Sequence, residues 1–404
     1  MDYRVIEELA IPNDSKMVLV VLDGIGGLAI PGREGTELHV ARRPNLNLLA
    51  RRGSCGLMDP IMPGVTPGSG PAHFALFGYD PVENNIGRGV LEAAGIGMDL
   101  TPSDVAVRIN FCTLGPDGRI VDRRAGRIPT EECERLCEKL QRAVNLGDGV
   151  EFICRAVKEH RAMILLRGEG LSGDLLDTDP QQVGLEPLPP RALVDTEESR
   201  RTIRVVGKLL TQAREILADE PKANFILLRG FAKNRHYRSL QERFKLRGYA
   251  IANYPMYRGV AKLIGMDLHP VTPDVRSQFE ALREKYADYD YFFLHVKYTD
   301  SRGEDGDFDA KVRVIEEVDS YLPIVTALEP QVLVVTGDHS TPALLKAHSW
   351  HPVPVALVSP TARMDDVERF DEVSCAKGIL GRFPAVELMA LMLAHALRLK
   401  KFGA

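Results

Sequence analysis

Three short runs of apolar, mostly β-branched residues constrain the fold of this 404-residue chain more than any other feature. They are MVLVVLD at 17–23, YFFLHVKYTD at 291–300 and QVLVVTGDH at 331–339. Each is nearly continuous rather than alternating, which is typical of strands buried on both faces of a parallel sheet. Each run also leads to an aspartate: Asp23, Asp300 or Asp338. Because open α/β sheets bind ligands beyond the carboxyl ends of their strands, we expect these three carboxylates to converge.

Helical patterns lie between the runs. Leucines recur at three- and four-residue spacing in residues 42–53, and apolar residues recur in the same way in residues 309–325. The middle of the chain differs, with shorter elements, turn signals and two further helix candidates at 130–144 and 199–218. We therefore predict an α/β fold in which a discontinuous sheet domain, residues 1–100 and 259–404, is interrupted by an α+β domain at 101–258.

Composition argues against several classes of protein. No apolar run approaches the roughly 20 residues that span a bilayer, and the N-terminus lacks a signal-peptide pattern, so we expect a cytoplasmic protein with no membrane partner. A net charge of −5 argues against a nucleic-acid partner, which would require a basic surface. The six cysteines form no CxxC pair and are expected to be reduced. The sequence is compatible with a homo-oligomer.

The region after the third run is rich in metal-ligand residue types. Asp338, His339, His348 and His351 lie close together in TGDHSTPALLKAHSWHP. Carboxylate and imidazole groups are common ligands of divalent metal ions. A lone histidine is more often an ordinary core or surface residue. An Asp-His pair at a strand end, with acids after two other strands, favours a metal site.

A nucleophile candidate and a basic cluster complete the candidate chemistry. Ser69 lies in PGSGPAHFALFGYD, where a helix is expected to begin and to place backbone N–H groups near the hydroxyl. The stretch is not the GxSxG elbow, and a Gly-Ser-Gly turn alone is usually only a turn.

The basic cluster DRRAGR at 122–127, with Arg229, suits carboxylate or phosphate binding, although a solvated charged turn has the same composition.

Taken together, these motifs resemble the archaeal-type 2,3-bisphosphoglycerate-independent phosphoglycerate mutases of the alkaline phosphatase superfamily. The resemblance rests on VVLDGIGG, RRPNLNLLARRGSCG, PGSGPAHFALFGYDP, GRGVLEAAGIGMDL, DRRAGR, YTDSRGEDGDFDAKV and VTGDHSTPALLKAHSWHPVPV, in this order along nearly the whole chain. It implies an alkaline-phosphatase-like three-layer sheet domain with an inserted substrate-binding domain. It also implies an enzyme that interconverts 3-phosphoglycerate and 2-phosphoglycerate through a phosphoserine intermediate, in glycolysis and gluconeogenesis.

The resemblance further implies two divalent metal ions, with Mn²⁺ expected first and Zn²⁺, Co²⁺ or Mg²⁺ as alternatives. One ion would be held by Asp23, Ser69, Asp338 and His339, with Ser69 as the nucleophile. The other would be held by Asp300, Glu304 and His348. The residues implied to bind phosphoglycerate are His73, Asp122, Arg123, Arg127, Arg229 and Arg258.

Three positions depart from the family pattern. Gly70 and Pro71 replace an Asp-Thr pair beside the nucleophile, and Arg258 stands at what resembles a lysine position. Glu304 stands where histidine is common, and a carboxylate there would favour manganese or magnesium over zinc. Two alternatives to the mutase stay open: a related metal-dependent phosphomutase or phosphohydrolase acting on another small phosphate ester, and a catalytically silent relative that binds phosphometabolites.

Overall fold

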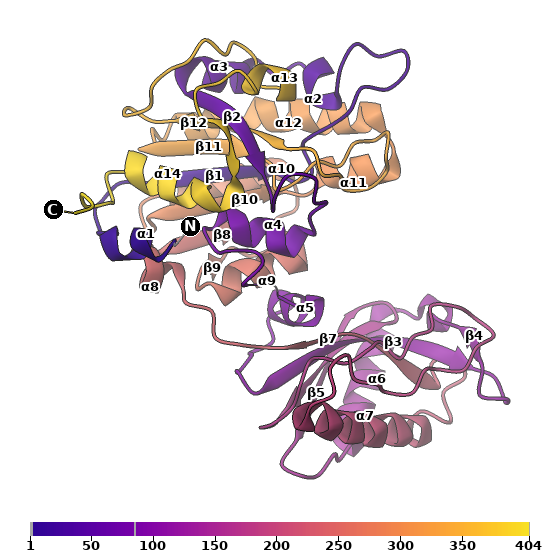
Figure 1. Cartoon of the computed structure of the whole chain (residues 1–404). Coiled ribbons are helices and arrows are strands. Elements are labelled where there is room, and N and C mark those ends of the chain that lie inside the picture. The colour runs from indigo at the N-terminus through magenta and orange to yellow at the C-terminus, as the bar shows by residue number, and fades with distance from the viewer. Residues whose placement is uncertain (1–2, 85, 404) are drawn as a thin grey trace. The chain divides into compact units, whose positions relative to one another are not determined.

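The computed structural model describes residues 3–84 and 86–403. The chain divides into two compact units: unit 1 comprises Met1–Asn85 and Arg238–Ala404, and unit 2 comprises Ile86–Tyr237 (Figure 1). The chain therefore passes from one unit to the other at residues 85–86 and 237–238, and not near residues 100 and 258 as expected. The borders differ because α5 (Arg88–Gly95) packs on strands of unit 2, whereas β8 (Gly248–Ile251) pairs with the sheet of unit 1.

Unit 1 is built on an eight-stranded sheet with the order β13-β2-β12-β11-β1-β10-β8-β9. At its centre β1 (Met17–Leu22) lies between β10 (Tyr291–Val296) and β11 (Val332–Thr336) and is parallel to both. These strands are the three apolar runs, and every residue in them is buried. Their prediction as buried parallel strands is confirmed. The other strands are β2 (Ser54–Asp59), β8, β9 (Asp267–Leu268), β12 (Val353–Val358), which is antiparallel to both neighbours, and β13 (Gly381–Pro384).

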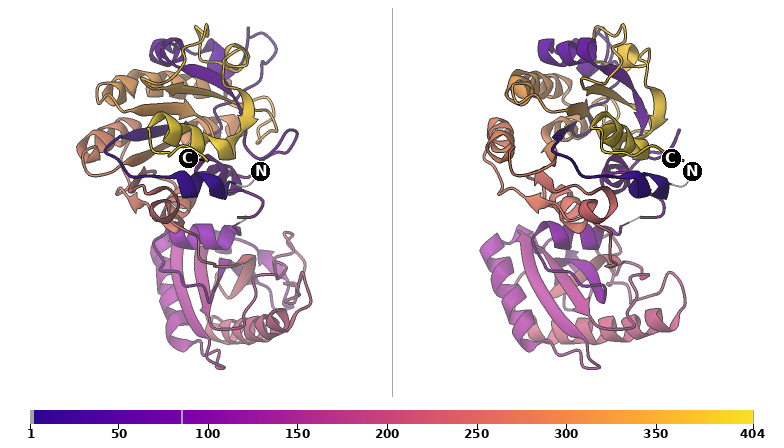
Figure 2. Two further views of the ribbon diagram at one scale, coloured as in Figure 1. Left: turned by 60° about the vertical axis from the view of Figure 1, so that its left-hand side comes forward. Right: turned by 90° about the vertical axis from the view of Figure 1, so that its left-hand side faces the viewer.

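Helices cover both faces of this sheet, so unit 1 has three layers and the predicted α/β class is confirmed (Figures 1 and 2). Val18 and Val20 of β1 point to one face and pack with Phe279 and Ile315. That face carries α2 (Glu37–Val40), α3 (Pro44–Arg52), α10 (Val275–Lys285), α12 (Phe308–Thr326) and α13 (Glu372–Cys375). On the other face, Phe293 of β10 meets Phe77 edge-on, with ring centroids 4.9 Å apart. The helices there include α4 (Ser69–Leu76), α9 (Pro255–Leu263) and α14 (Leu388–His395).

One strand boundary differs from the prediction. β10 ends at Val296, and Lys297 already has helical backbone angles, so α11 (Tyr298–Asp305) begins directly after the strand. Asp300 therefore lies in the first turn of a helix and does not end the strand. The remaining short elements of unit 1 are α1 (Arg4–Leu9), α8 (Leu240–Phe244) and the 3₁₀ turn η2 (Ala385–Glu387).

Unit 2 is an α+β unit with a five-stranded antiparallel sheet. Its strands are β3 (Asp104–Leu114), β4 (Ile120–Asp122), β5 (Glu151–Lys158), β6 (Arg161–Arg167) and β7 (Phe225–Lys233). The two predicted helices form as α6 (Thr130–Ala143) and α7 (Glu197–Ile216). They pack on the odd-numbered side chains of β3, such as Val107 and Ile109. The even-numbered side chains of β3, including Arg108, are left for the opposite face.

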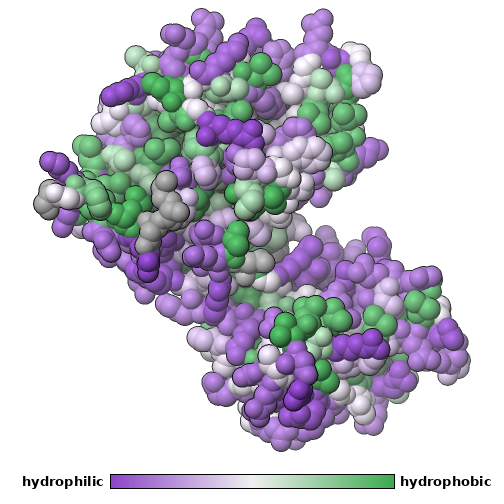
Figure 3. Space-filling view, viewed as in Figure 1, coloured by the Kyte–Doolittle hydropathy of each residue, from purple (hydrophilic) through white to green (hydrophobic). Residues whose placement is uncertain are grey.

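The exposed surface is mainly polar. On the face shown in Figure 3, hydrophilic side chains predominate and apolar ones occur in separate patches. Among the described residues, no helix is both long enough and apolar enough to cross a membrane.

Two glycines in helices of unit 2 provide a matched test of this packing. A Cβ at Gly89 of α5 would lie 2.5 Å from the carbonyl oxygen of Gly230 and 2.6 Å from that of Ala106. We expect Gly89→Ala to destabilise the protein by about 1–3 kcal/mol, because backbone atoms cannot move aside easily. Gly207→Ala on α7 meets no atom within 4 Å and should stabilise it by about 0.5–1 kcal/mol. Urea unfolding measures both, and equal stability of the two variants would contradict the close approach of α5.

Candidate active site

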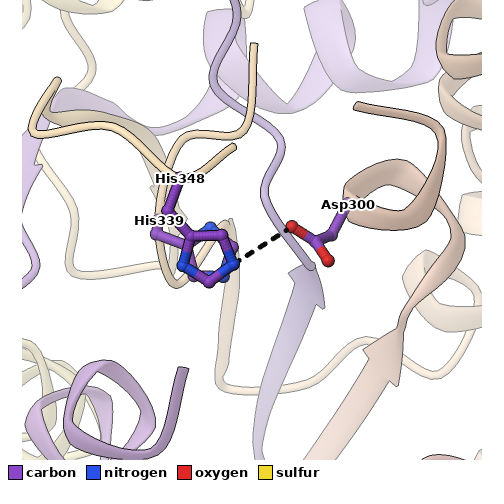
Figure 4. A group of neighbouring side chains, drawn as sticks. All are labelled: Asp300, His339 and His348. Carbon is purple, nitrogen blue, oxygen red and sulfur yellow. Dashed lines mark ion pairs between the residues drawn. The ribbon is translucent and has the colours of Figure 1, made fainter. Parts of the chain in front are cut away.

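The predicted convergence of the three carboxylates is visible at the carboxyl edge of the sheet. Asp23, Asp300 and Asp338 are each at most 1% exposed. With two histidines they form two groups of candidate metal ligands. The first is Asp23, Asp338 and His339, and the second is Asp300, His339 and His348, shown in Figure 4. Within each group the ligand atoms lie within 4.8 Å of one another, and His339 belongs to both.

Three carboxylate oxygens of the first group are buried without a hydrogen bond among the described residues. His339 Nε2 lies 3.2 Å from Asp23 Oδ1 and 3.2 Å from Asp338 Oδ2. Within the described part of the chain, the three oxygens are both those of Asp23 and Oδ2 of Asp338, although Asp23 Oδ2 forms an ion pair with the Lys297 ammonium at 3.1 Å. Burial, reinforced by the charge of Asp23, raises the pKa of Asp338 well above its usual range. Burial also acts to raise the pKa of Asp23, but His295 and His339 outweigh it and hold that pKa well below its usual range.

Thr341 orients the ring of His339. Its Oγ1 lies 2.6 Å from Asp300 Oδ1 and 3.0 Å from His339 Nδ1. The hydroxyl has one proton, which it donates to the carboxylate, so it accepts a hydrogen bond from Nδ1–H of His339. This pattern leaves Nε2 facing Asp23 and Asp338. An imidazole held through Nδ1, with Nε2 directed at unpartnered buried carboxylates, fits a divalent metal ion.

The second group is prepared in a similar way. His348 Nδ1 donates to the carbonyl oxygen of Pro67 at 2.9 Å, and its Nε2 lies 3.5 Å from Asp300 Oδ1. The rings of His339 and His348 stack with their centroids 3.7 Å apart, and Figure 4 shows His348 facing Asp300. Pro67 lies two residues before Ser69. The hydrogen bond therefore ties this ligand group to the turn that carries the candidate nucleophile.

Ser69 is the first residue of α4, so the predicted helix start is confirmed. Its Oγ is 3.4 Å from His339 Nε2, which places the hydroxyl at the first ligand group. His73, one turn later, is fully buried, and its Nδ1 lies 2.8 Å from the carbonyl oxygen of Ser69 and 3.3 Å from Asp338 Oδ2. Burial, together with the charge of His295, lowers the pKa of His73 to about 3. His73 is therefore neutral at pH 7, and it holds the first turn of α4, which carries the candidate nucleophile, from inside the core.

The structure does not bring Glu304 to the second group. Its side chain is exposed, and neither ligand group found among the described residues includes it. Glu304 follows Asp300 by four residues on α11, which carries it about 6 Å along the helix axis, away from the sheet edge. His351, a further candidate in the sequence, lies outside both groups and hydrogen-bonds Ser349 Oγ at 2.9 Å.

Lys297 is a site residue that the sequence reasoning missed. Its Nζ lies 3.1 Å from Asp23 Oδ2, forms an ion pair with Asp300 and donates to the hydroxyl of Tyr257 at 3.2 Å. Burial opposes its charge, but Asp23 and Asp300 outweigh this effect and raise the pKa of Lys297. One cation thus contacts a carboxylate of each ligand group. The available signal was its place near the end of the predicted strand 291–300, three residues before Asp300.

A second candidate site is a basic cavity of about 480 Å³ in unit 2. Arg108 on β3 lies directly opposite Arg229 on β7, and Asn110 lies directly opposite Arg161 on β6. Like charges at directly paired positions repel each other, so this face is suited to an anion. The residues that line the cavity are Arg108, Asn110, Arg123, Arg124, Arg127, Glu159, His160, Arg161, Gln181 and Arg229.

A buried carboxylate orients one of the predicted arginines in this cavity. Asp179 accepts from Arg123 Nε at 3.0 Å and from its Nη2 at 2.7 Å, a bidentate pair that fixes the plane of the guanidinium. Asp122 does not line the cavity. Its carboxylate accepts from the backbone N–H groups of Arg124 and Gly126, at 2.8 and 2.6 Å, and so shapes the turn that carries Arg127.

Arg258 lies in unit 1 and belongs to neither candidate site. Its Nη1 donates to the carbonyl oxygens of Ala252 at 3.0 Å and His269 at 2.6 Å. These contacts tie α9 to the segments that follow β8 and β9. The family resemblance implies that Arg258 binds phosphoglycerate, but Nη1 of this guanidinium is used in holding the backbone.

Comparison with known proteins agrees with these observations. Residues 50–223 match the family model of 2,3-bisphosphoglycerate-independent phosphoglycerate mutase. A probable mutase of this kind from Thermus thermophilus is 50% identical over 100% of this chain and 99% of its own, and one from Aquifex aeolicus is 50% identical over 99% and 100%.

Two solved structures are also similar over most of their length. The cofactor-independent phosphoglycerate mutase of Thermoplasma acidophilum has a TM-score of 0.73 and 31% identity, covering 94% of this chain and 100% of its own. A Pyrococcus horikoshii protein has a TM-score of 0.82 and 28% identity, covering 97% and 100%. With half of its residues identical to curated relatives along their full length, the chain belongs to the enzyme family of 2,3-bisphosphoglycerate-independent phosphoglycerate mutases.

Proposed function

We propose that this chain interconverts 3-phosphoglycerate and 2-phosphoglycerate through a phosphoserine intermediate on Ser69, at a site that holds two divalent metal ions. The reaction would serve glycolysis and gluconeogenesis in the cytoplasm. The observation that carries the proposal is the position of the Ser69 hydroxyl, 3.4 Å from His339 Nε2, beside buried oxygens of Asp23 and Asp338 that accept no hydrogen bond among the described residues.

The ligands for the metal ions follow from the two groups. Asp23, Asp338 and His339, with Ser69, would hold one ion, and Asp300 and His348 would hold the other, with His339 adjacent to both. When bound, the ions would lower the pKa of the Ser69 hydroxyl and neutralise charge on the transferring phosphoryl group. Mn²⁺ is the first candidate because the family resemblance implies it, and Zn²⁺, Co²⁺ and Mg²⁺ are alternatives because carboxylate and imidazole sets of this kind accept several divalent ions.

The protein's own residues contribute the remaining steps. Ser69 lies in the first turn of α4, where backbone N–H groups have no partner within the helix and favour an anion. Its oxygen would attack phosphorus and release glycerate, whose other hydroxyl would then take the phosphoryl group back from Ser69. The ammonium of Lys297, which contacts Asp23 and Asp300, adds positive charge beside the transferring group.

The arginine cavity of unit 2 supports an anionic substrate. Arg123, Arg127 and Arg229 line it, as the family resemblance implies for substrate contacts. Arginine forks match carboxylate and phosphate geometry, and the bidentate pair with Asp179 holds Arg123 in place for this task. We propose that these arginines bind the carboxylate and the phosphate or hydroxyl groups of phosphoglycerate.

A product assay tests the proposed reaction. Metal-loaded protein with 3-phosphoglycerate is expected to yield 2-phosphoglycerate without stoichiometric inorganic phosphate, because the phosphoryl group is transferred back to glycerate. Both products are measured in the same reaction. Release of phosphate alone would instead identify a phosphohydrolase, and the absence of both products with Mn²⁺, Zn²⁺, Co²⁺ and Mg²⁺ would favour a catalytically silent relative.

Removal of the nucleophile should separate chemistry from metal binding. We expect Ser69→Ala to lower mutase turnover by at least about 10⁴-fold, as removal of a covalent nucleophile does in other enzymes. Mn²⁺ binding should persist, because Asp23, Asp338 and His339 remain. Turnover is measured by coupled assay and metal binding by calorimetry. Undiminished turnover in the variant would remove Ser69 from its proposed role.

The exposed position of Glu304 gives a contrasting pair of variants. Glu304→Gln is expected to leave the affinity for Mn²⁺ within about twofold of the unmodified protein, whereas His348→Gln should weaken it by about 10-fold or more. Calorimetric titration of the chelator-treated protein measures both. An equally large loss in Glu304→Gln would show that this carboxylate does reach a metal ion.

A further inference from the structure

A fully buried lysine lies beneath the candidate active site. Lys311 belongs to α12, and its side chain is 0% exposed. Its ammonium donates to three backbone carbonyl oxygens: those of Gly24 at 2.8 Å, Gly26 at 3.0 Å and Thr341 at 2.8 Å. A buried charge is costly unless it is fully hydrogen-bonded, and here all three N–H donors of the ammonium are used.

The three carbonyls belong to the two loops that carry the first ligand group. Gly24 and Gly26 follow Asp23 at the end of β1, and Thr341 follows Asp338 and His339 after β11. The loops also touch directly, since Thr341 N donates to the carbonyl oxygens of Gly24 at 3.2 Å and Gly26 at 3.1 Å. A Cβ at Gly26 would lie 1.9 Å from Ser340 Oγ, so only glycine permits this approach. Lys311 therefore lies where the two loops cross.

Short paths lead from these carbonyls to both ligand groups. The backbone N–H of Gly24 donates to Asp338 Oδ1 at 3.1 Å. The hydroxyl of Thr341 contacts Asp300 and His339, as described above. A shift of either loop would therefore move ligands of both groups.

Two acidic side chains hold the far ends of the same loops. Glu37 Oε1 accepts from the N–H of Ala343 at 2.7 Å, and Glu372 Oε1 accepts from the N–H of Gly27 at 2.8 Å. Together with Lys311 they bind the loops almost wholly through main-chain groups. Of these three side chains, Lys311 is the one that hydrogen-bonds both loops.

We propose that Lys311 is a positioning residue, whose ammonium fixes the loops after β1 and β11 so that both ligand groups are formed before a metal ion binds. The inference rests on the two-metal site of the proposed function. It goes beyond that site because Lys311 would contact neither the substrate nor the metal ions. Its effect would pass through backbone carbonyls alone.

Metal affinity separates positioning from general stability. Lys311→Met keeps an unbranched side chain of similar length and removes the three hydrogen bonds. The matched control is Ile315→Ala, on the same face of α12, which leaves a core cavity but removes no hydrogen bond to either loop. By calorimetry, Lys311→Met is expected to bind Mn²⁺ about 10-fold or more weakly, and Ile315→Ala within about twofold of the unmodified protein. Equal affinity in folded Lys311→Met would overturn the proposal.

Amide hydrogen exchange tests the same inference without metal. In chelator-treated protein, the N–H of Thr341 should be protected as strongly as those of β1, and in Lys311→Met it should exchange faster while β1 stays protected. Protection that does not differ between the two proteins would count against Lys311. If the unmodified protein bound no Mn²⁺, the proposed metal site would fail, and this exchange comparison would still decide the role of Lys311.

A second variant and the unmodified protein cover the case in which Lys311→Met does not fold. The double variant Lys311→Met, Glu372→Gln removes one positive and one negative charge, so the net charge around the two loops is unchanged. The same loss of Mn²⁺ affinity is expected. In the unmodified protein, protection of Thr341 should be present before Mn²⁺ is added. Protection that develops only after addition would show that the metal ion, and not Lys311, orders the loops.

Discussion

Three carboxylates share one edge of the central sheet, and the arrangement around them follows from their mutual repulsion. Asp23, Asp300 and Asp338 are buried where their charges cannot be relieved by water. The pKa values of Asp23 and Asp338 shift in opposite directions, since burial favours protonation of both and only at Asp23 do His295 and His339 outweigh it. Lys297 relieves part of it by contacting two of the three carboxylates. The remaining charge, beside imidazole nitrogens held in position, is what divalent cations would neutralise.

Close backbone approach makes this density of ligands attainable. Gly24 has a left-handed backbone conformation, φ +62°, and a Cβ there would lie 2.5 Å from Thr341 Oγ1 and 2.9 Å from Asp300 Cβ. The loop after β1 can therefore lie against both the loop after β11 and the start of α11. Lys311 stabilises this contact from the core, and Thr341 links it to the ligands. Rigid main-chain contacts thus fix the ligand atoms more tightly than flexible side chains could.

Unit 2 places repelling cations on one sheet face for a comparable reason. The pairing of β3 with β7 brings Arg108 opposite Arg229. Carboxylates compensate these two charges only in part. Glu92 lies 2.5 Å from Arg108 Nε, but the nearest carboxylate oxygen to Arg229 Nε is 3.6 Å away. The left-handed backbone of Ala125 and Arg127, at φ 48° and 50°, is a second local cost at the rim of the same cavity. Repulsion and strain of this kind concentrate at binding sites.

The sequence by itself determined the strands, their parallel pairing and the convergence of Asp23, Asp300 and Asp338, because continuous apolar runs and their polar ends are local signals. The motif order also determined the family. Only the tertiary structure decided which polar residues face the site. Glu304 has the residue type of a ligand but lies one helical turn beyond Asp300, with an exposed side chain. Lys297 lies in a predicted strand and Lys311 in a predicted helix, and neither local pattern marks a site residue. Their long-range contacts do: Lys297 pairs with Asp23, 274 residues away, and Lys311 donates to Gly24, 287 residues away. Such contacts depend on how β1, β10 and α12 pack, which no local pattern encodes.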